Sequence, residues 1–191
     1  MNSKLVLFLL LCTSLQLKAQ DTLRVFTWQE ALKAHPDSVF FIDASRMKWE
    51  NVPEQILTFT QLKGLDLSKN RLAFIPETFG VFKQLRVIDL SKNRLTEFPV
   101  ALCQLTGLKK ILLSRNMMTT IPECIGFFSN LTYLDLWDNP IVALPEQLTK
   151  VTTLKTVDLR GILFNKKFQE GWRARMPAVN WIFDAPCECI Q

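Results

Sequence analysis

One spacing organises most of this chain: leucine or another apolar residue returns every 23 residues. Position 0 of this repeat is occupied in successive units by Val39, Leu62, Leu85, Leu108, Leu131 and Leu154. In each of the first five units, apolar residues also stand at positions 3, 5, 10, 13, 17 and 20. The apolar residues at positions 3 and 5 predict a short strand with one buried face. No unit can bury its apolar face alone, so the period predicts a solenoid of stacked units.

Two polar or turn-forming positions accompany the apolar ones. Position 8 holds an asparagine in four units: Asn70, Asn93, Asn116 and Asn139. A buried amide must satisfy its donors and its acceptor, so we expect these side chains to bond backbone groups of stacked units. Position 14 holds a proline in five units: Pro53, Pro76, Pro99, Pro122 and Pro145. Proline fixes φ and ends the preceding turn, and the segment after it is expected to return over the core as short helical turns.

This pattern resembles the 23-residue leucine-rich repeat, LxxLxLxxNxLxxLPxxhxxL, and residues 88–95 are close to a consensus copy. The resemblance covers residues 39–164, as six units of which the last is degenerate. It implies an α/β fold: a curved solenoid with a parallel β-sheet on the concave face and short helical or irregular segments on the convex face. Met47 and Ile162 replace the asparagine in the first and sixth units, at the ends where a solenoid needs caps.

Residues 21–38 are predicted to form the N-terminal cap. Thr27 and Glu30 have the spacing of a capping box, which predicts a helix from there through Ala34, ended by Pro36. The single histidine, His35, then lies at the helix C-terminus, and we interpret it as structural.

Residues 165–191 are predicted to form the C-terminal cap. Residues 166–176 have an amphipathic helical pattern with Phe168 and Trp172 one turn apart, and the alternation around Trp181 predicts a strand. The helix and the strand together would shield the last repeat.

The first 20 residues are predicted to be a secretory signal peptide, cleaved near Ala19-Gln20. Their apolar run, residues 5–11, is far shorter than the about 20 residues of a membrane span. An alternative is lipidation of Cys12. With no second long apolar run, we expect a secreted, periplasmic or cell-surface protein without a transmembrane segment.

The cysteines suit an oxidising compartment. Cys103, Cys124, Cys187 and Cys189 remain after cleavage, and four cysteines allow three disulfide connectivities. Cys103 and Cys124 lie on adjacent return segments, as either a disulfide or two buried thiols. Cys187 and Cys189 lack zinc-site spacing and are interpreted as stapling the cap or as free thiols, so no metal and no cofactor is expected.

Composition argues against several classes of function. One histidine confined to a cap excludes Ser-His-Asp and Cys-His sets, and carboxylates on an open sheet have no cleft to exclude water. We therefore expect no enzyme. The chain has 23 basic and 18 acidic residues, and removing Lys4 and Lys18 with the signal leaves 21 basic ones. The remaining excess of basic over acidic residues is too small to indicate that the protein binds nucleic acid.

The resemblance also implies that partners dock on the concave sheet, through positions 2, 4, 6, 7 and 9 of each unit. An acidic column at position 4 stands beside basic residues at positions 7 and 9, and we interpret both as a solvated array of weak ion pairs. An alternative is a basic ridge for an anionic glycan or another polyanion, made by Arg46, Lys48, Lys69, Arg71, Lys92 and Arg94.

The strongest site hypothesis lies where the columns break their pattern. Leu112 replaces an aspartate, Trp137 a serine, Asp138 a base and Met117 a base. With their neighbours they predict an apolar patch with a polar rim, typical of protein-binding hot spots. Its residues are Val87, Lys110, Leu112, Arg115, Met117, Tyr133, Asp135, Trp137 and Asp138. Alternatively, Trp137 and Met117 lie over Pro140 or the C-terminal cap. The sequence thus predicts a secreted module that binds a protein or peptide of unknown identity.

Overall fold

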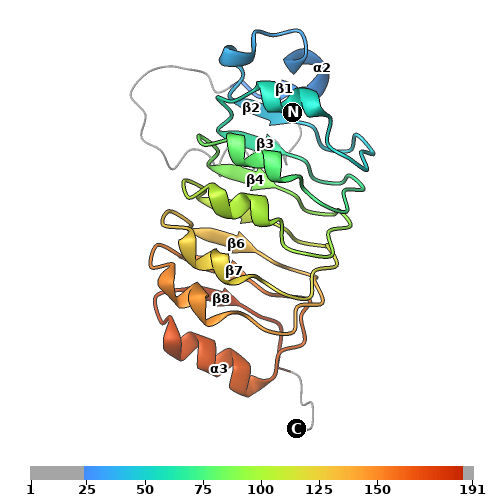
Figure 1. Cartoon of the computed structure of the whole chain (residues 1–191). Helices are drawn as coiled ribbons and strands as arrows, with labels where there is room; N and C mark the ends of the chain where they lie inside the picture. The colour runs from blue at the N-terminus through green and yellow to red at the C-terminus, as the bar shows by residue number, and fades with distance from the viewer. Residues whose placement is uncertain (1–23, 187–191) are drawn as a thin grey trace.

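The computed structural model describes residues 24–186, in which eight parallel strands form one sheet in chain order (Figure 1). The predicted signal peptide, Cys12, Cys187 and Cys189 lie outside the described residues. The strands are β1 (Phe26–Thr27), β2 (Phe41–Asp43), β3 (Gly64–Asp66), β4 (Val87–Asp89), β5 (Lys110–Leu112), β6 (Tyr133–Asp135), β7 (Thr156–Asp158) and β8 (Asn180–Ile182). Strands β2 to β7 occupy positions 2–4 of the six repeat units, as the alternation predicts. The caps add β1 and β8, so the sheet is two strands wider than the repeats alone.

The return segments are 3-10 helices, and each begins directly after the proline at position 14. They are η2 (Glu54–Thr58), η3 (Glu77–Val81), η4 (Val100–Gln104), η5 (Glu123–Phe127) and η6 (Glu146–Lys150). They cover the face of the sheet opposite the concave one (Figure 1). Their position-17 side chains are buried, as at Phe79 and Leu148. The core therefore lies between the sheet and these helices.

The asparagines at position 8 bind neighbouring units to each other through the backbone. In Asn93, the Nδ2 atom donates to the carbonyls of Leu67 at 3.0 Å and Leu90 at 2.9 Å, and Oδ1 accepts from the Leu72 N–H at 3.0 Å. Asn70, Asn116 and Asn139 repeat the same three contacts in their own units. Each buried amide thereby satisfies the position-5 carbonyls of two units, as expected from the sequence.

The N-terminal cap contains the expected capping box but a shorter helix. The Glu30 carboxylate accepts from the Thr27 N–H at 2.8 Å, and the Thr27 hydroxyl oxygen accepts from the Glu30 N–H at 3.3 Å. Helix α2 (Trp28–Ala31) ends before Ala34, because the chain then tightens into a turn in which the Ala34 N–H donates to Ala31. His35 caps the following 3-10 helix, η1 (Pro36–Ser38).

The C-terminal cap closes the other end of the core. Asn165 caps helix α3 (Lys166–Arg175), and Met176 follows as its C-cap, so the helix ends one residue before the expected end. Strand β8 pairs with β7 in the register of a further repeat. The Trp172 and Trp181 rings are 5.5 Å apart and buried between helix and strand. The helix and the strand thus cover the last unit.

The backbone is left-handed at one position of every repeat unit, which the sequence does not reveal, and also at Lys48 in the first unit, with a φ of 60°. Position 7 has a positive φ in all six units, at Arg46, Lys69, Lys92, Arg115, Asp138 and Gly161, with values between 56° and 74°. Only the last unit uses the residue that adopts this conformation without strain. This turn aims the chain out of each strand and onto the edge of the solenoid.

Candidate functional site

The aspartates at position 4 hold the turn that follows each strand. The Oδ1 atoms of Asp43, Asp66, Asp89, Asp135 and Asp158 each accept a hydrogen bond from the backbone N–H two residues later, at 2.8–3.2 Å. A carboxylate oxygen satisfies an N–H that the end of the strand would otherwise leave unpaired. The acidic column therefore has a structural role in every unit that contains it.

In the N-terminal half of the concave face, this column places carboxylates on adjacent strands. Asp66 is paired in register with Asp43 on one side and with Asp89 on the other. Burial, reinforced by the Asp89 carboxylate, raises the pKa of Asp66 to about 7, although hydrogen bonds from Ser68 oppose the shift. Ionisation of Asp66 is thus unfavourable in the folded state.

In the C-terminal half, Trp137 lies between two arginines. The Arg115 guanidinium carbon lies 4.4 Å from the centroid of the Trp137 ring, and that of Arg160 lies 5.7 Å away. Both distances are within the range of cation–π attraction. Arg115 also reaches Asp138, with Nε 3.4 Å from Oδ2, and Arg160 makes a forked contact with the buried Asp158. We call Trp137, Arg115, Asp138, Arg160 and Asp158 the Trp137 cluster.

Asp135 lies directly before this cluster on β6. Its carboxylate accepts from the Trp137 N–H at 3.0 Å, and the residue is 9% exposed. Burial raises the pKa of Asp135 to about 6, against opposing hydrogen bonds from Trp137 and Ser114. Burial and the nearby carboxylates of Asp135 and Asp158 also raise the pKa of the half-buried Tyr133. This part of the sheet combines a neutral phenol, an aromatic ring and charges that are mostly paired with each other.

The remaining residues of the predicted patch do not all join this cluster. Val87 is only 3% exposed and packs with Phe41, and Leu112 packs partly against the same pair. This contact crosses Gly64, which lies between them in the sheet register and has no side chain to separate them. Val87 therefore contributes no exposed surface. Lys110 pairs in register with Tyr133 and is half-buried.

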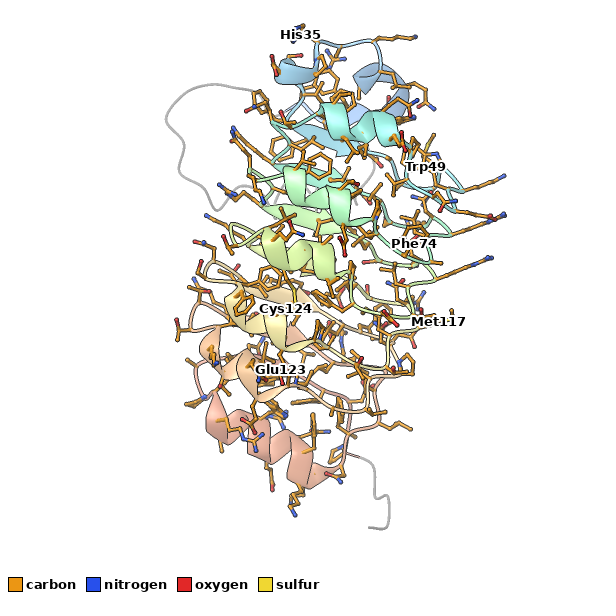
Figure 2. All side chains as sticks on the ribbon, viewed as in Figure 1. His35, Trp49, Phe74, Met117, Glu123 and Cys124 are labelled. Atoms are coloured by element: carbon orange, nitrogen blue, oxygen red, sulfur yellow. A yellow bond between two sulfur atoms is a disulfide. The ribbon has the colours of Figure 1, made fainter. Side chains whose placement is uncertain are left out.

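Met117 lies apart from the concave cluster. Figure 2 shows it on the same edge of the solenoid as Trp49 and Phe74, away from the helix that carries Cys124. Its side chain is 50% exposed. The patch predicted as one surface is thus a half-buried aromatic cluster on the sheet together with a separate exposed methionine on the edge.

The basic residues of the alternative ridge also divide between two places. Lys69 and Lys92 stand at the left-handed position 7 and are half-buried. Arg46, Lys48 and Arg94 are exposed, and Arg71 lies 3.8 Å from Glu50. The positive charge therefore concentrates at the N-terminal half of the edge.

The convex face carries a disulfide between Cys103 on η4 and Cys124 on η5, with their Cα atoms 5.8 Å apart. It joins two adjacent repeats. Of the two states that the sequence left open for this pair, the structure contains the disulfide.

Within residues 24–186, no group of three or more His, Cys, Asp or Glu side chains is arranged to hold a metal ion. In the same part of the chain, every helix is too short or too polar to cross a membrane.

Comparisons with known proteins agree with the repeat geometry. The model of the leucine rich repeat family matches residues 60–118 and 83–141. The chain is a leucine-rich repeat protein. A solved leucine-rich repeat protein of Leptospira interrogans is 23% identical, with a TM-score of 0.68 over 86% of this chain and 49% of that one. The functional domain of InlJ from Listeria monocytogenes, which includes a cysteine ladder, is 20% identical, with a TM-score of 0.60 over 74% of this chain and 29% of that one. No match to a curated protein was found.

The chain spans less than half the length of either of these two solved proteins, and at these identities the likeness establishes the fold alone. Leucine-rich repeat domains are generally protein-interaction modules and are typically non-catalytic.

The geometry adds two residues to the predicted patch, Arg160 and Asp158. The position of Arg160 could have been predicted from the sequence. It occupies the same repeat position as Trp137 in the next unit and must therefore lie beside it.

Proposed function

We propose that this leucine-rich repeat protein is exported and binds a protein or peptide on its concave face, with the Trp137 cluster at the centre of the contact. One observation carries the proposal: a half-buried tryptophan stands on the sheet between two arginines that carboxylates hold in place. Tryptophan, tyrosine and arginine are the side chains that dominate binding energy at protein interfaces. Six repeat strands at about 4.8 Å spacing give a surface about 24 Å across, enough for a peptide or a small interface.

Export is part of the same proposal. It is supported by the predicted signal peptide and by the disulfide between Cys103 and Cys124, since disulfides persist in oxidising compartments. The final location is then outside the cytoplasm, either released or held at the cell surface.

The test is affinity enrichment from the extracellular or surface extract of the source cells, with the protein as bait at about 0.15 M and about 0.5 M salt. A Tyr133→Ala/Trp137→Ala variant is compared with wild type, and Phe127→Ala, at an exposed residue of the convex face, is the matched control. Because Arg115 and Arg160 are already paired with carboxylates, we expect a partner that is retained at both salt concentrations. Loss of this partner with the double variant, but not with the control, supports the proposal.

Binding to an anionic glycan or another polyanion is the second candidate, favoured by the exposed Arg46, Lys48 and Arg94 near one end of the sheet. Retention that disappears at about 0.5 M salt and is indifferent to Trp137→Ala would support it in place of the first.

A further inference from the structure

Position 9 of the repeat forms a row of exposed side chains along the edge of the solenoid, where the chain leaves each strand. The row consists of Lys48, Arg71, Arg94, Met117, Pro140 and Leu163. Backbone hydrogen bonds align three of its members: the position-9 N–H donates to the position-10 carbonyl of the preceding unit, at 2.7 Å for Arg71, 2.9 Å for Arg94 and 2.8 Å for Met117. We call this set the edge row.

The chemistry of the edge row changes halfway along it. The first three members are basic and the last three are apolar. Met117 is 50% exposed and Leu163 is 78% exposed, and Val142, two residues after Pro140, adds a further apolar side chain at 72% exposure. Single exposed apolar residues are ordinary, but here three occur in three consecutive units, at or two residues after the same repeat position.

The basic half of the edge row keeps a positive charge. Glu50 lies 3.8 Å from Arg71, whereas Lys48 and Arg94 form no ion pair with any residue of 24–186. The left-handed turn at Arg46 places another exposed cation two residues before Lys48. A partner that covers this half must therefore supply negative charge.

Two members of the edge row are close in sequence to the Trp137 cluster, although the Met117 side chain itself lies on the edge. Arg115 and Asp138 each stand two residues before a member of the row, at Met117 and Pro140. A chain bound at the cluster can continue onto the apolar half of the row without leaving the protein surface.

We infer that the edge row receives a peptide segment of the partner that carries acidic side chains at one end and apolar side chains at the other. This inference rests on the proposed binding function and specifies the chemistry of its partner. Six positions at about 4.8 Å spacing span about 24 Å, which corresponds to about seven residues of extended chain. Acidic groups complement the basic half, and apolar groups gain by burying Met117, Val142 and Leu163.

The test is selection of displayed random peptides of about twelve residues on the immobilised protein, long enough to span the row. The most enriched peptides are synthesised with a fluorescent label and titrated by anisotropy. Two variants divide the row: Lys48→Glu/Arg94→Glu for its basic half and Met117→Ser/Leu163→Ser for its apolar half. Lys150→Glu on η6 and Phe127→Ser on η5 are the matched controls, since both residues are away from the edge row.

The expected peptides carry an acidic cluster and an apolar cluster in one constant order. Each variant of the row should weaken binding at least about tenfold, and the charge variant should also remove most of its salt dependence. The controls should bind like wild type. Failure to enrich any peptide, enriched peptides without acidic residues, or equal binding by the row variants would overturn the inference.

Trp137→Ala separates this inference from the proposed function. If it abolishes binding while the row variants do not, the function stands and the inference fails. If the row variants weaken binding while Trp137→Ala has no effect, the inference stands and the proposal centred on Trp137 fails.

Discussion

Replacing Asp66 by asparagine should stabilise the protein at alkaline pH and flatten the dependence of its stability on pH. In the folded protein the pKa of Asp66 is about 7, against an ordinary value of 3.8, because the carboxyl is buried next to the Asp89 carboxylate. The folded state therefore binds this proton more tightly than the unfolded state. Its contribution to stability is fully present below about pH 4 and is lost as the pH rises through about 7.

The structure sets the size of the effect. A difference of about three pKa units, at about 1.4 kcal/mol per unit, gives an upper limit of about 4 kcal/mol for ionising Asp66 in the folded protein. Asp66 keeps some contact with solvent, which screens the carboxylate, so we expect about 2 kcal/mol. Asparagine cannot ionise, and its side-chain oxygen can still accept the hydrogen bond from the Ser68 N–H.

Urea unfolding followed by circular dichroism at about pH 8.5 and about pH 4.5 measures the free energy of unfolding on both sides of this range. Asp66→Asn should be about 2 kcal/mol more stable than wild type at the higher pH, and the difference should shrink below about 1 kcal/mol at the lower pH. Glu54→Gln, at an exposed residue of η2, is the control and should change neither value. An asparagine variant that is no more stable than wild type at about pH 8.5 would refute the assignment of strain to this carboxylate.

Three further substitutions test the contacts between stacked units, each by urea unfolding. Cys103→Ser should lower the free energy of unfolding by about 3 kcal/mol, since the bond to Cys124 closes a loop of 21 residues in sequence separation, and a reductant should then destabilise wild type but not the variant. Asn93→Ala should lower it by about 1–3 kcal/mol, because the buried Leu72 N–H loses its acceptor, whereas the Leu67 and Leu90 carbonyls keep the second donors supplied by Asn70 and Asn116. Gly161→Ala should lower it by about 1–2 kcal/mol, since φ is +74° and an added Cβ would lie 3.0 Å from the Asp138 Cα; a neutral result would contradict that account.

The repeat explains why so much of this fold could be predicted from the sequence. With a constant 23-residue period, residues at one repeat position are neighbours in the sheet, so that Ile88, for example, pairs with Leu65 and Ile111. The strands, the return helices and the asparagine hydrogen bonds all follow from this single register. The same reasoning places Arg160 beside Trp137, although the predicted patch did not include it.

The features that could not be predicted depend on contacts outside the period. Strand β1 has only two residues and exists because it pairs with β2, so no local pattern indicates it. Val87 is buried because of two residues at the same repeat position in other units. Phe41 supplies an aromatic ring, and Gly64, between them in the sheet, has no side chain to keep Val87 and Phe41 apart. Position 7 is left-handed in every unit, yet four of the six units use a lysine or an arginine there, and neither prefers that conformation.

Residues that depart from the repeat pattern are the most informative about binding, because the stability of the solenoid does not require them. The stacked asparagines and the carboxylates that hold the turns already stabilise each unit. A unit that replaces the residue usual at positions 6 or 9 therefore needs no exchange there to be stable. Trp137 replaces the small, nearly buried serine of the preceding units and remains half-exposed. Met117 replaces a solvated base by an exposed thioether, which solvation does not favour. Trp137 contacts Arg115 and Arg160 of the neighbouring units, whereas the Met117 side chain is 50% exposed, and both residues lie where a partner can reach them. The proposed binding of a partner accounts for both residues at once.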